Sequence, residues 1–268
     1  MKVIVMGSGY WGSNYVRELG NRCVLVVEPD EVQAKTVADR FNVQVEPELG
    51  RFRDFDAAVI VTPPELHANL AMPLLQQGKY VLVEKPLANS TQDARALAAF
   101  PRCMAGHVYL WHPEIIKLHD GAYSIDHMIT RRTNNGPVRT WCDALWDLAP
   151  HDISICNYLA SWHMPEVRAW VWRDKAVLNL DYSIWPAFTY VSWLGAPKKR
   201  LVEVIPKTGD RVIFDDLAVV LEEPPLARMI KDFVSGDWDD RGQAAVGVQV
   251  VEVLEDATRT VHQDSAAP

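Results

Sequence analysis

The sequence lacks a long hydrophobic run: no uninterrupted apolar stretch approaches the roughly 18 residues that a membrane-spanning helix needs. It has only four cysteines and no C-x-x-C pair, so neither a disulfide framework nor a cysteine zinc site is indicated. The cysteines lie in apolar stretches, as small core residues do in a reducing compartment. The apolar run after Met1-Lys2 is too short for a signal peptide, and we expect a cytoplasmic protein.

A surplus of positive charge is also absent. Lys and Arg number 27 against 35 Asp and Glu, which gives a formal charge of −8. Without a long basic run, nucleic acids and anionic membranes are poor candidates for the main partner. The histidines show no zinc-ligand spacing, and no G-x-S-x-G motif indicates a serine hydrolase. We therefore expect no metal, no nucleic acid and no membrane, but a small-molecule ligand.

A chain of 268 residues favours two domains, which we place at 1–112 and 113–268. In the first domain, short apolar runs alternate with helical patterns, which predicts an α/β Rossmann fold with a doubly wound parallel sheet. The second is predicted as an α+β domain with a largely antiparallel open sheet. The first domain's strands are expected at 3–6, 24–27, 57–61, 80–83 and 103–107. In the second domain, strands are expected at 122–133, 167–173, 177–184, 188–194, 200–205 and 211–214, and helices at 115–119, 147–159, 226–234 and 244–261.

A G-x-G-x-x-G motif, Gly7-Ser8-Gly9-Tyr10-Trp11-Gly12, follows the first strand and opens the first helix. This context predicts a dinucleotide-binding turn, in which the pyrophosphate meets backbone N–H groups at the helix start. Glu28 ends the second strand and can accept the adenosine ribose hydroxyls, so NAD is favoured over NADP. The alternative is that Glu28 only ends its strand and Asp30 only caps the next helix.

Two further strand ends carry polar residues. Thr62-Pro63-Pro64-Glu65 is predicted to begin a helix, with Thr62 as N-cap and Glu65 completing a capping box. Glu84-Lys85-Pro86 follows the apolar run Tyr80–Val83, so Lys85 is expected at the carboxyl end of a central parallel strand, where ligands bind. The alternative for this motif is a solvated charge pair in a turn.

In the second domain, Asp147 and His151 are four residues apart and share a helical face if the helix continues through Pro150. A carboxylate beside a histidine suits proton transfer near neutral pH. Taken singly, Asp147 could be an N-cap, His151 a buried histidine, and Asp152 a structural residue.

Seven of the ten tryptophans lie between Trp141 and Trp193. Most are expected in the core. Because Trp185, Tyr190 and Trp193 belong to strands with one face open, we expect an aromatic sheet face that joins copies of the chain into a homodimer or homotetramer.

Taken together, the ordered motifs resemble the glucose-fructose oxidoreductase / inositol dehydrogenase / MocA-like (Gfo/Idh/MocA) family. The resemblance rests on 9–14, Thr62-Pro63-Pro64 with His67, Glu84-Lys85-Pro86, Gly106-His107 before Trp111-His112-Pro113, Arg131-Arg132-Thr133-Asn134, 147–152 and 191–194. Within the family, the chain is similar to the branch that oxidises UDP-N-acetylglucosamine or its uronic acid at the 3-hydroxyl. It is short for the family, and His112 stands where a smaller amide is expected.

The resemblance implies roles for single residues. Lys85 would be the active-site lysine, with Asp147 and His151 as the catalytic carboxylate and histidine. Glu84 would contact the nicotinamide ribose, while Thr62, Pro63 and His67 line the cofactor. The residues near the substrate would be Arg131, Arg132 and Asn134, with solvated strand charges as the alternative for the arginines.

These inferences predict a hydride transfer from a secondary hydroxyl of a sugar or sugar nucleotide to NAD. His151, oriented by Asp147, would take the hydroxyl proton with help from Lys85. The alternatives are an inositol or another hydroxyl position, a redox-neutral reaction with tightly held NAD, and a non-catalytic NAD-sensing regulator on the same fold.

Overall fold

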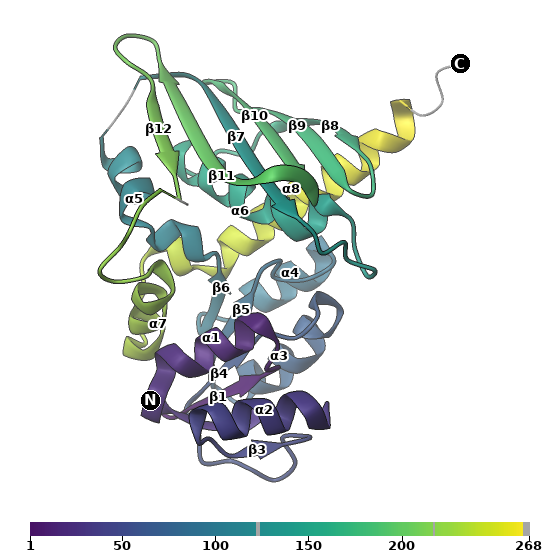
Figure 1. Cartoon of the computed structure of the whole chain (residues 1–268), viewed down its shortest axis with the longest axis vertical. Helices are drawn as coiled ribbons and strands as arrows, with labels where there is room; N and C mark the ends of the chain where they lie inside the picture. The colour runs from purple at the N-terminus through teal and green to yellow at the C-terminus, as the bar shows by residue number, and fades with distance from the viewer. Residues whose placement is uncertain (122–123, 217, 265–268) are drawn as a thin grey trace. The chain divides into compact units, whose positions relative to one another are not determined.

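The computed structural model describes residues 1–121, 124–216 and 218–264 (Figure 1). The chain divides into two compact units. The first comprises 1–107 and 223–248, and the second comprises 108–222 and 249–268. Residues 223–248, which we had assigned to the second domain, thus group with the first unit, because α7 (Pro225–Ser235) packs on α1 (Tyr10–Leu19).

The first unit contains a parallel sheet, as predicted, but with six strands in place of the five expected, because the two-residue strand β3 (Val45–Glu46) had not been predicted. Its strand order is β3-β2-β1-β4-β5-β6. This is the doubly wound order, in which β2 and β3 are added on one side of β1 and β4 to β6 on the other. All four residues of β1 and of β4 are buried, because helices cover both faces of such a sheet. The strands are β1 Val3–Met6, β2 Cys23–Val27, β3 Val45–Glu46, β4 Ala57–Ile60, β5 Tyr80–Glu84 and β6 Cys103–Gly106.

The helices of the first unit form two groups. One group has α1 in contact with α2 (Glu31–Phe41), α7 and strands β1 and β2. In the other, α3 (His67–Gln76) contacts α4 (Thr91–Ala98), β4 and β5. The side chains of Asp30 and Ser90 cap α2 and α4 by accepting bonds from backbone N–H groups. Short 3₁₀ turns lie at Gly20–Arg22, Pro64–Leu66 and Asp240–Gly242.

The predicted capping box at Thr62 is wrong. The chain forms a 3₁₀ turn over Pro64–Leu66 before α3 starts, and Pro63 occupies the N-cap position without a side-chain bond. Because a residue before proline avoids the helical region, Pro64 holds Pro63 extended, at ψ 142°. The Oγ1 atom of Thr62 is buried and has no hydrogen-bond partner among the described residues.

The second unit contains a six-stranded mixed sheet in the order β12-β11-β7-β10-β9-β8. It is largely antiparallel, as predicted, but β7 and β10 run parallel. The strands are β7 Ile125–Asn135, β8 Glu166–Val171, β9 Lys175–Asp181, β10 Pro186–Ser192, β11 Leu194–Pro206 and β12 Val212–Asp215. Residues 122–123, where we expected the first of them to begin, lie outside the described residues.

Helix α6 (Ala144–Leu159) packs on β7, β9 and β10 and buries one face of this sheet. It also contacts α5 (Pro113–Asp120) and the 3₁₀ turn η3 (Val108–Trp111). The last helix, α8 (Ala244–Asp264), contributes residues from 249 onward to this unit, where Thr258 accepts a bond from the indole of Trp146.

The open sheet face differs from the one we expected. Trp185 and Trp193 are buried, at 7% and 0% exposure, and only Tyr190 is half-buried. Alternation along the strands puts other apolar side chains outside, namely Trp170, Phe188 and Ile213, each more than 40% exposed. No helix among the described residues is long and apolar enough to cross a bilayer.

Candidate functional site

Five strand ends meet at one edge of the parallel sheet in the first unit. Because all six strands run parallel, the segments that follow β1, β2, β4, β5 and β6 emerge on the same side. They begin with Gly7, Glu28, Val61, Lys85 and His107. This edge is the place where open α/β sheets bind ligands.

The glycines after β1 fit a bound dinucleotide. Gly7 has φ +96°, and a Cβ on it would lie 2.8 Å from the carbonyl oxygen of Val61. A Cβ on Gly12 would lie 2.1 Å from the Gly7 oxygen, so only glycine allows the helix to pack this closely on the turn. A Cβ on Gly9 would meet only the Gln33 side chain, at 3.8 Å, which leaves this backbone open to a pyrophosphate. Tyr10 and Trp11 flank the turn as an exposed, edge-on ring pair, and their contact with the cofactor stays a prediction.

Glu28 is tied directly to this turn. Its Oε2 accepts the backbone N–H of Ser8 at 2.8 Å and the Ser8 hydroxyl at 2.9 Å. Its Oε1 accepts the N–H of Asp30 at 3.0 Å, while Asp30 itself caps α2. Glu28 therefore fixes the glycine-rich turn in addition to offering a carboxylate where the resemblance expects the ribose.

Glu84 and Lys85 stand at the end of β5. Glu84 is buried and accepts the hydroxyl of Tyr15 at 2.6 Å and the backbone N–H of Lys85 at 2.9 Å. Burial raises the pKa of Glu84, while the Tyr15 hydrogen bond and the charge of Lys85 oppose this shift. The Lys85 side chain is half-buried at the ligand-binding edge, so it lies where the sequence predicted.

His67 joins two of the loops at this edge. Its Nδ1 lies 2.9 Å from the carbonyl oxygen of Pro86, its Nε2 lies 2.9 Å from that of Thr62, and the ring is fully buried. Burial lowers the pKa of His67, and a neutral imidazole has only one N–H to donate. The neutral His67 ring therefore donates to only one of these two carbonyl oxygens while it lies against both loops, and its predicted contact with the cofactor stays a prediction.

His107 also lies at this edge, although the sequence did not indicate it as a candidate site residue. Gly106 pairs with Glu84 across β5 and β6, so His107 follows its strand at the level of Lys85. The ring is buried, and neither ring nitrogen has a hydrogen-bond partner among the described residues. Burial, followed by the charge of Lys85, lowers the pKa of His107 to about 3. Its position directly after an apolar strand was the available signal.

In the second unit, α6 continues through Pro150, so the four-residue spacing brings Asp147 and His151 to the same side of the helix. Asp143 caps the helix by accepting the N–H of Trp146. Asp147 is therefore not the cap, although it stands in the first turn. Both Asp147 and His151 are 8% exposed.

Asp147 has partners that the sequence did not indicate. Its Oδ2 accepts the indole N–H of Trp193 at 2.8 Å and lies 3.6 Å from Nε of Arg139. Trp193 is fully buried just beyond β10, so it holds the carboxylate in a fixed orientation. The orientation of His151 by Asp147 stays a prediction.

The structure separates the neighbouring arginines. Because side chains alternate along β7, Arg132 faces the buried side and Arg131 the exposed side. Arg132 donates to Asp152 of α6 from Nε at 2.8 Å and from Nη2 at 3.2 Å. Of the two arginines, only Arg132 therefore has its side chain on the sheet face that α6 covers. Asn134 accepts a bond from Arg200 at 2.6 Å.

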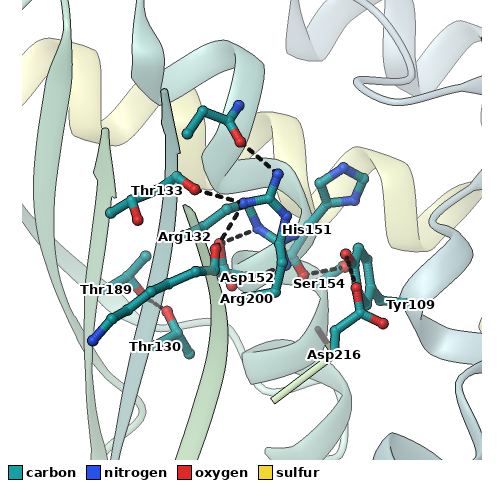
Figure 2. A network of polar contacts seen from close by, with 12 residues as sticks. Tyr109, Thr130, Arg132, Thr133, His151, Asp152, Ser154, Thr189, Arg200 and Asp216 are labelled. Atoms are coloured by element: carbon teal, nitrogen blue, oxygen red, sulfur yellow. Dashed lines mark hydrogen bonds and ion pairs between the residues drawn. The ribbon is translucent and has the colours of Figure 1, made fainter. Parts of the chain in front are cut away.

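Tyr109 and Asp216 complete a polar cluster around His151, and both were missed (Figure 2). The Tyr109 hydroxyl donates to Asp216 at 2.9 Å, and its ring centroid lies 5.1 Å from that of His151. They are 107 positions apart in sequence, so no local pattern could reveal the pair.

No group of three metal-ligating side chains occurs in the part of the chain that the structure describes.

Known proteins resemble the chain in sequence. Residues 1–104 match the family model GFO_IDH_MocA, described as an oxidoreductase family with an NAD-binding Rossmann fold. A 4-carboxy-2-hydroxymuconate-6-semialdehyde dehydrogenase from Sphingobium is 29% identical over 60% of this chain and 59% of its own length. The UDP-N-acetylglucosamine 3-dehydrogenase from Acidithiobacillus ferrooxidans is 25% identical over 63% of this chain and 57% of its own length. The matches thus span less than two thirds of these relatives.

Solved structures share the fold over nearly the whole chain. A crystal structure of the same Acidithiobacillus ferrooxidans enzyme has a TM-score of 0.85 at 21% identity and covers 97% of both chains. The myo-inositol dehydrogenase from Lactobacillus casei, in complex with NAD(H) and myo-inositol, has a TM-score of 0.83 at 17% identity and covers 98% of this chain and 95% of its own. Residues 1–104 thus match the NAD-binding Rossmann fold of the Gfo/Idh/MocA oxidoreductase family.

Proposed function

We propose that this protein oxidises a secondary hydroxyl group of a sugar or sugar nucleotide, using NAD. The observation that carries the proposal is the half-buried Lys85 at the ligand-binding edge of an NAD-binding sheet. A turn with only a structural role would not require the Lys85 cation, because the neighbouring buried carboxylate of Glu84 already accepts a hydrogen bond from Tyr15. The relatives that oxidise UDP-N-acetylglucosamine and inositol support this reaction class.

The proposed mechanism divides the work among a few side chains. Bound NAD supplies the hydride acceptor. His151 accepts the hydroxyl proton, because a neutral imidazole is a base near physiological pH. Lys85 donates a hydrogen bond to the reacting oxygen and stabilises the negative charge that develops on it. Glu84 and Glu28 contact the two ribose groups of NAD, while Thr62, Pro63, Tyr10 and Trp11 line it.

For substrate contact, we propose Lys85, Asp147, His151 and Asn134. Arg132 acts through its pair with Asp152, and Arg131 faces the open side of its sheet. The choice of substrate within the class follows the resemblance, which favours the 3-hydroxyl of a UDP-N-acetylhexosamine or its uronic acid. The named activity of the Sphingobium relative adds semialdehydes to the compounds worth testing.

A panel assay tests this proposal. The purified protein is incubated with NAD or NADP and with UDP-sugars, TDP-sugars, inositols and semialdehydes, and NADH formation is followed by absorbance. We expect turnover with a sugar or sugar nucleotide and NAD. If NAD binds but no compound yields NADH, a redox-neutral reaction is tested next, by product analysis with the same panel. A protein that binds NAD and converts nothing in either assay would be a regulator, which contradicts the proposal.

We further propose that the chain forms a homodimer or homotetramer through the open sheet face of the second unit. Trp170, Val177 and Tyr190 stand in register on three neighbouring strands, and Phe188 stands beside Ile129. An exposed aromatic face of this kind marks an interface. Size-exclusion chromatography with light scattering should give an oligomer for the wild type and a smaller species for Phe188→Asp. A monomeric wild type would contradict the interface.

A further inference from the structure

The ring of His151 on α6 packs against the ring of Tyr109. The ring centroids of Tyr109 and His151 lie 5.1 Å apart, with the planes inclined at 68°. His151 comes from α6 and Tyr109 from η3, so the contact joins two separate elements (Figure 2). Such an edge-to-face arrangement restricts the imidazole to a narrow range of orientations.

Tyr109 is itself held on two sides. Its hydroxyl donates to Oδ2 of Asp216 at 2.9 Å. The guanidinium of Arg132 lies over its ring, 4.4 Å from the centroid, which is a cation–π contact in a buried setting. Burial raises the pKa of Tyr109, so the hydroxyl keeps its proton and remains a donor at neutral pH.

The other oxygen of Asp216 faces the ring of His112. His112 accepts the N–H of Glu114 at its Nδ1, so the proton of the neutral ring must be on Nε2. That Nε2 lies 3.6 Å from Oδ1 of Asp216, and the His112 side chain is fully buried. The family resemblance led us to expect a smaller amide at position 112. The longer imidazole side chain brings Nε2 to 3.6 Å from Asp216.

Arg132 connects the same cluster back to α6. It forms a two-point ion pair with Asp152, the residue directly after His151, and both side chains are at most 3% exposed. Fixing Asp152 sets the rotation of α6 at this turn, whereas Tyr109 sets the orientation of the His151 ring. The two restraints meet at Arg132, which contacts both Asp152 and Tyr109.

We propose that Tyr109 is a positioning residue for His151, with its ring held by the guanidinium of Arg132 and, to a smaller extent, by its bond to Asp216. The inference rests on the proposed function in one respect, the role of His151 as the proton acceptor. A reacting group displaced by about 1 Å can lose on the order of 100-fold in rate without a change in ground-state binding. The expected signature is therefore a loss in kcat with a nearly constant KM.

Three variants test the proposal. Tyr109→Leu removes the ring and the hydroxyl, and we expect kcat to fall at least tenfold with less than a threefold change in KM for the active compound. Tyr109→Phe keeps the ring contact and loses only the bond to Asp216, so we expect a two- to fivefold fall. Tyr158→Leu is the matched control, because Tyr158 stacks on His119 with centroids 4.1 Å apart, at the other end of α6. We expect it to lower the melting temperature and leave kcat unchanged.

A second measurement is independent of turnover. In protein labelled with ¹⁵N-histidine, the His151 ring signals are assigned by their loss in His151→Asn. We expect them to shift in Tyr109→Leu, to shift much less in Tyr109→Phe, and to remain in place in Tyr158→Leu. If no compound is turned over but this pattern is found, the proposed function fails while the positioning of His151 stands.

Two outcomes would overturn the positioning role. One is a folded Tyr109→Leu protein with wild-type kcat or an unshifted His151 signal. The other is a loss of kcat in Tyr158→Leu as large as that in Tyr109→Leu, since the effect would then follow general stability and not the contact with His151.

Discussion

The two units place their candidate site residues in different ways. In the first unit, Glu28, Lys85 and His107 each directly follow a parallel strand, so the topology alone brings them to one edge. In the second unit, the side chains around α6 depend on the register of a mixed sheet and on contacts as distant as that between Tyr109 and Asp216. In a parallel sheet, the candidate site residues therefore occur in short motifs after the strands, whereas in a mixed sheet they are distributed along the chain.

The largest expected effect concerns the two ends of β5. If the chemistry of the first unit is concentrated at its carboxyl edge, Lys85→Ala should lower kcat by about 10²- to 10⁴-fold, the usual worth of a proton-handling group. The NAD dissociation constant should stay within about threefold, an order-of-magnitude allowance for a group that acts mainly on the reacting oxygen. Steady-state kinetics and NAD titration measure the two quantities.

Lys79→Ala provides the matched control, because Lys79 directly precedes β5 and lies at the opposite end of the same strand. Its ammonium contacts the carbonyl oxygen of Phe55 and the ring of that residue. Turnover should be unchanged. Equal losses in the two variants would show that the strand end is not special and would remove the distinction between the edges.

In the second unit, the largest effect should be on stability. Asp152→Ala leaves the buried guanidinium of Arg132 without its carboxylate, and the free energy of unfolding should fall by about 3–5 kcal/mol. The double variant Arg132→Met with Asp152→Leu should recover most of this loss, because no buried charge remains. Denaturant unfolding measures the differences.

Asp126→Ala is the control for that pair, since Asp126 is an exposed carboxylate on β7 beside His127. Its effect should stay within about 0.5 kcal/mol. A loss of similar size in Asp126→Ala and Asp152→Ala would mean that the unit depends on overall charge and not on the buried pair.

These two cases show what the sequence could reveal. Continuous apolar runs such as Tyr80–Val83 located all strands of the first unit except the short β3, and the motifs after them predicted a ligand-binding edge. The second unit's elements were also predictable, because alternation and helical spacing are local. The orientation of Arg131 and Arg132 was not, since neighbouring residues on a strand face opposite ways and only the position of α6 decides which way is buried.

Other misses have equally specific causes. Trp193 was expected on an open face, but it lies past the end of β10 and turns inward to Asp147, which no strand pattern can show. At Thr62, the capping-box motif was present, yet the second proline kept the chain extended. In both places, a local rule was overridden by the geometry at the end of a regular element.

His107 should give the first unit an acid sensitivity of its own. Its pKa is lowered to about 3 in the folded protein, below the value of about 6.5 for a histidine in an unfolded chain. The stabilisation is thus fully present above about pH 6.5 and is lost as the pH falls toward 3. Between pH 6.5 and 5 the loss should reach about 2 kcal/mol.

Comparison with His107→Gln isolates this contribution, because all other groups titrate equally in both proteins. Stability measured at pH 6.5 and pH 5 should fall by less in His107→Gln, whereas His119→Gln, at a half-exposed histidine, should behave as the wild type. Parallel pH profiles for wild type and His107→Gln would show that His107 is not held neutral.

Cofactor preference gives a smaller effect at the same edge. Glu28→Gln removes the charge that disfavours a 2′-phosphate but keeps a side chain able to bond to Ser8. The ratio of kcat/KM for NAD to that for NADP should fall about tenfold, equivalent to about 1.4 kcal/mol. Glu31→Gln, in the first turn of α2, is the control and should leave the ratio unchanged. An unchanged ratio in Glu28→Gln would mean that Glu28 only holds the glycine-rich turn and does not select between NAD and NADP.

The smallest expected effect concerns Thr62, whose sequence motif predicted a helix cap that the structure does not contain. The Thr62 hydroxyl is buried without a hydrogen-bond partner among the described residues, so Thr62→Val should change the free energy of unfolding by less than about 0.5 kcal/mol, or increase it. Ser90→Ala, which removes a hydroxyl that accepts the N–H of Asp93, should cost about 1 kcal/mol. Thermal unfolding without NAD compares the two. A loss of about 1 kcal/mol in Thr62→Val would restore Thr62 as a cap and would place the start of α3 under local sequence control.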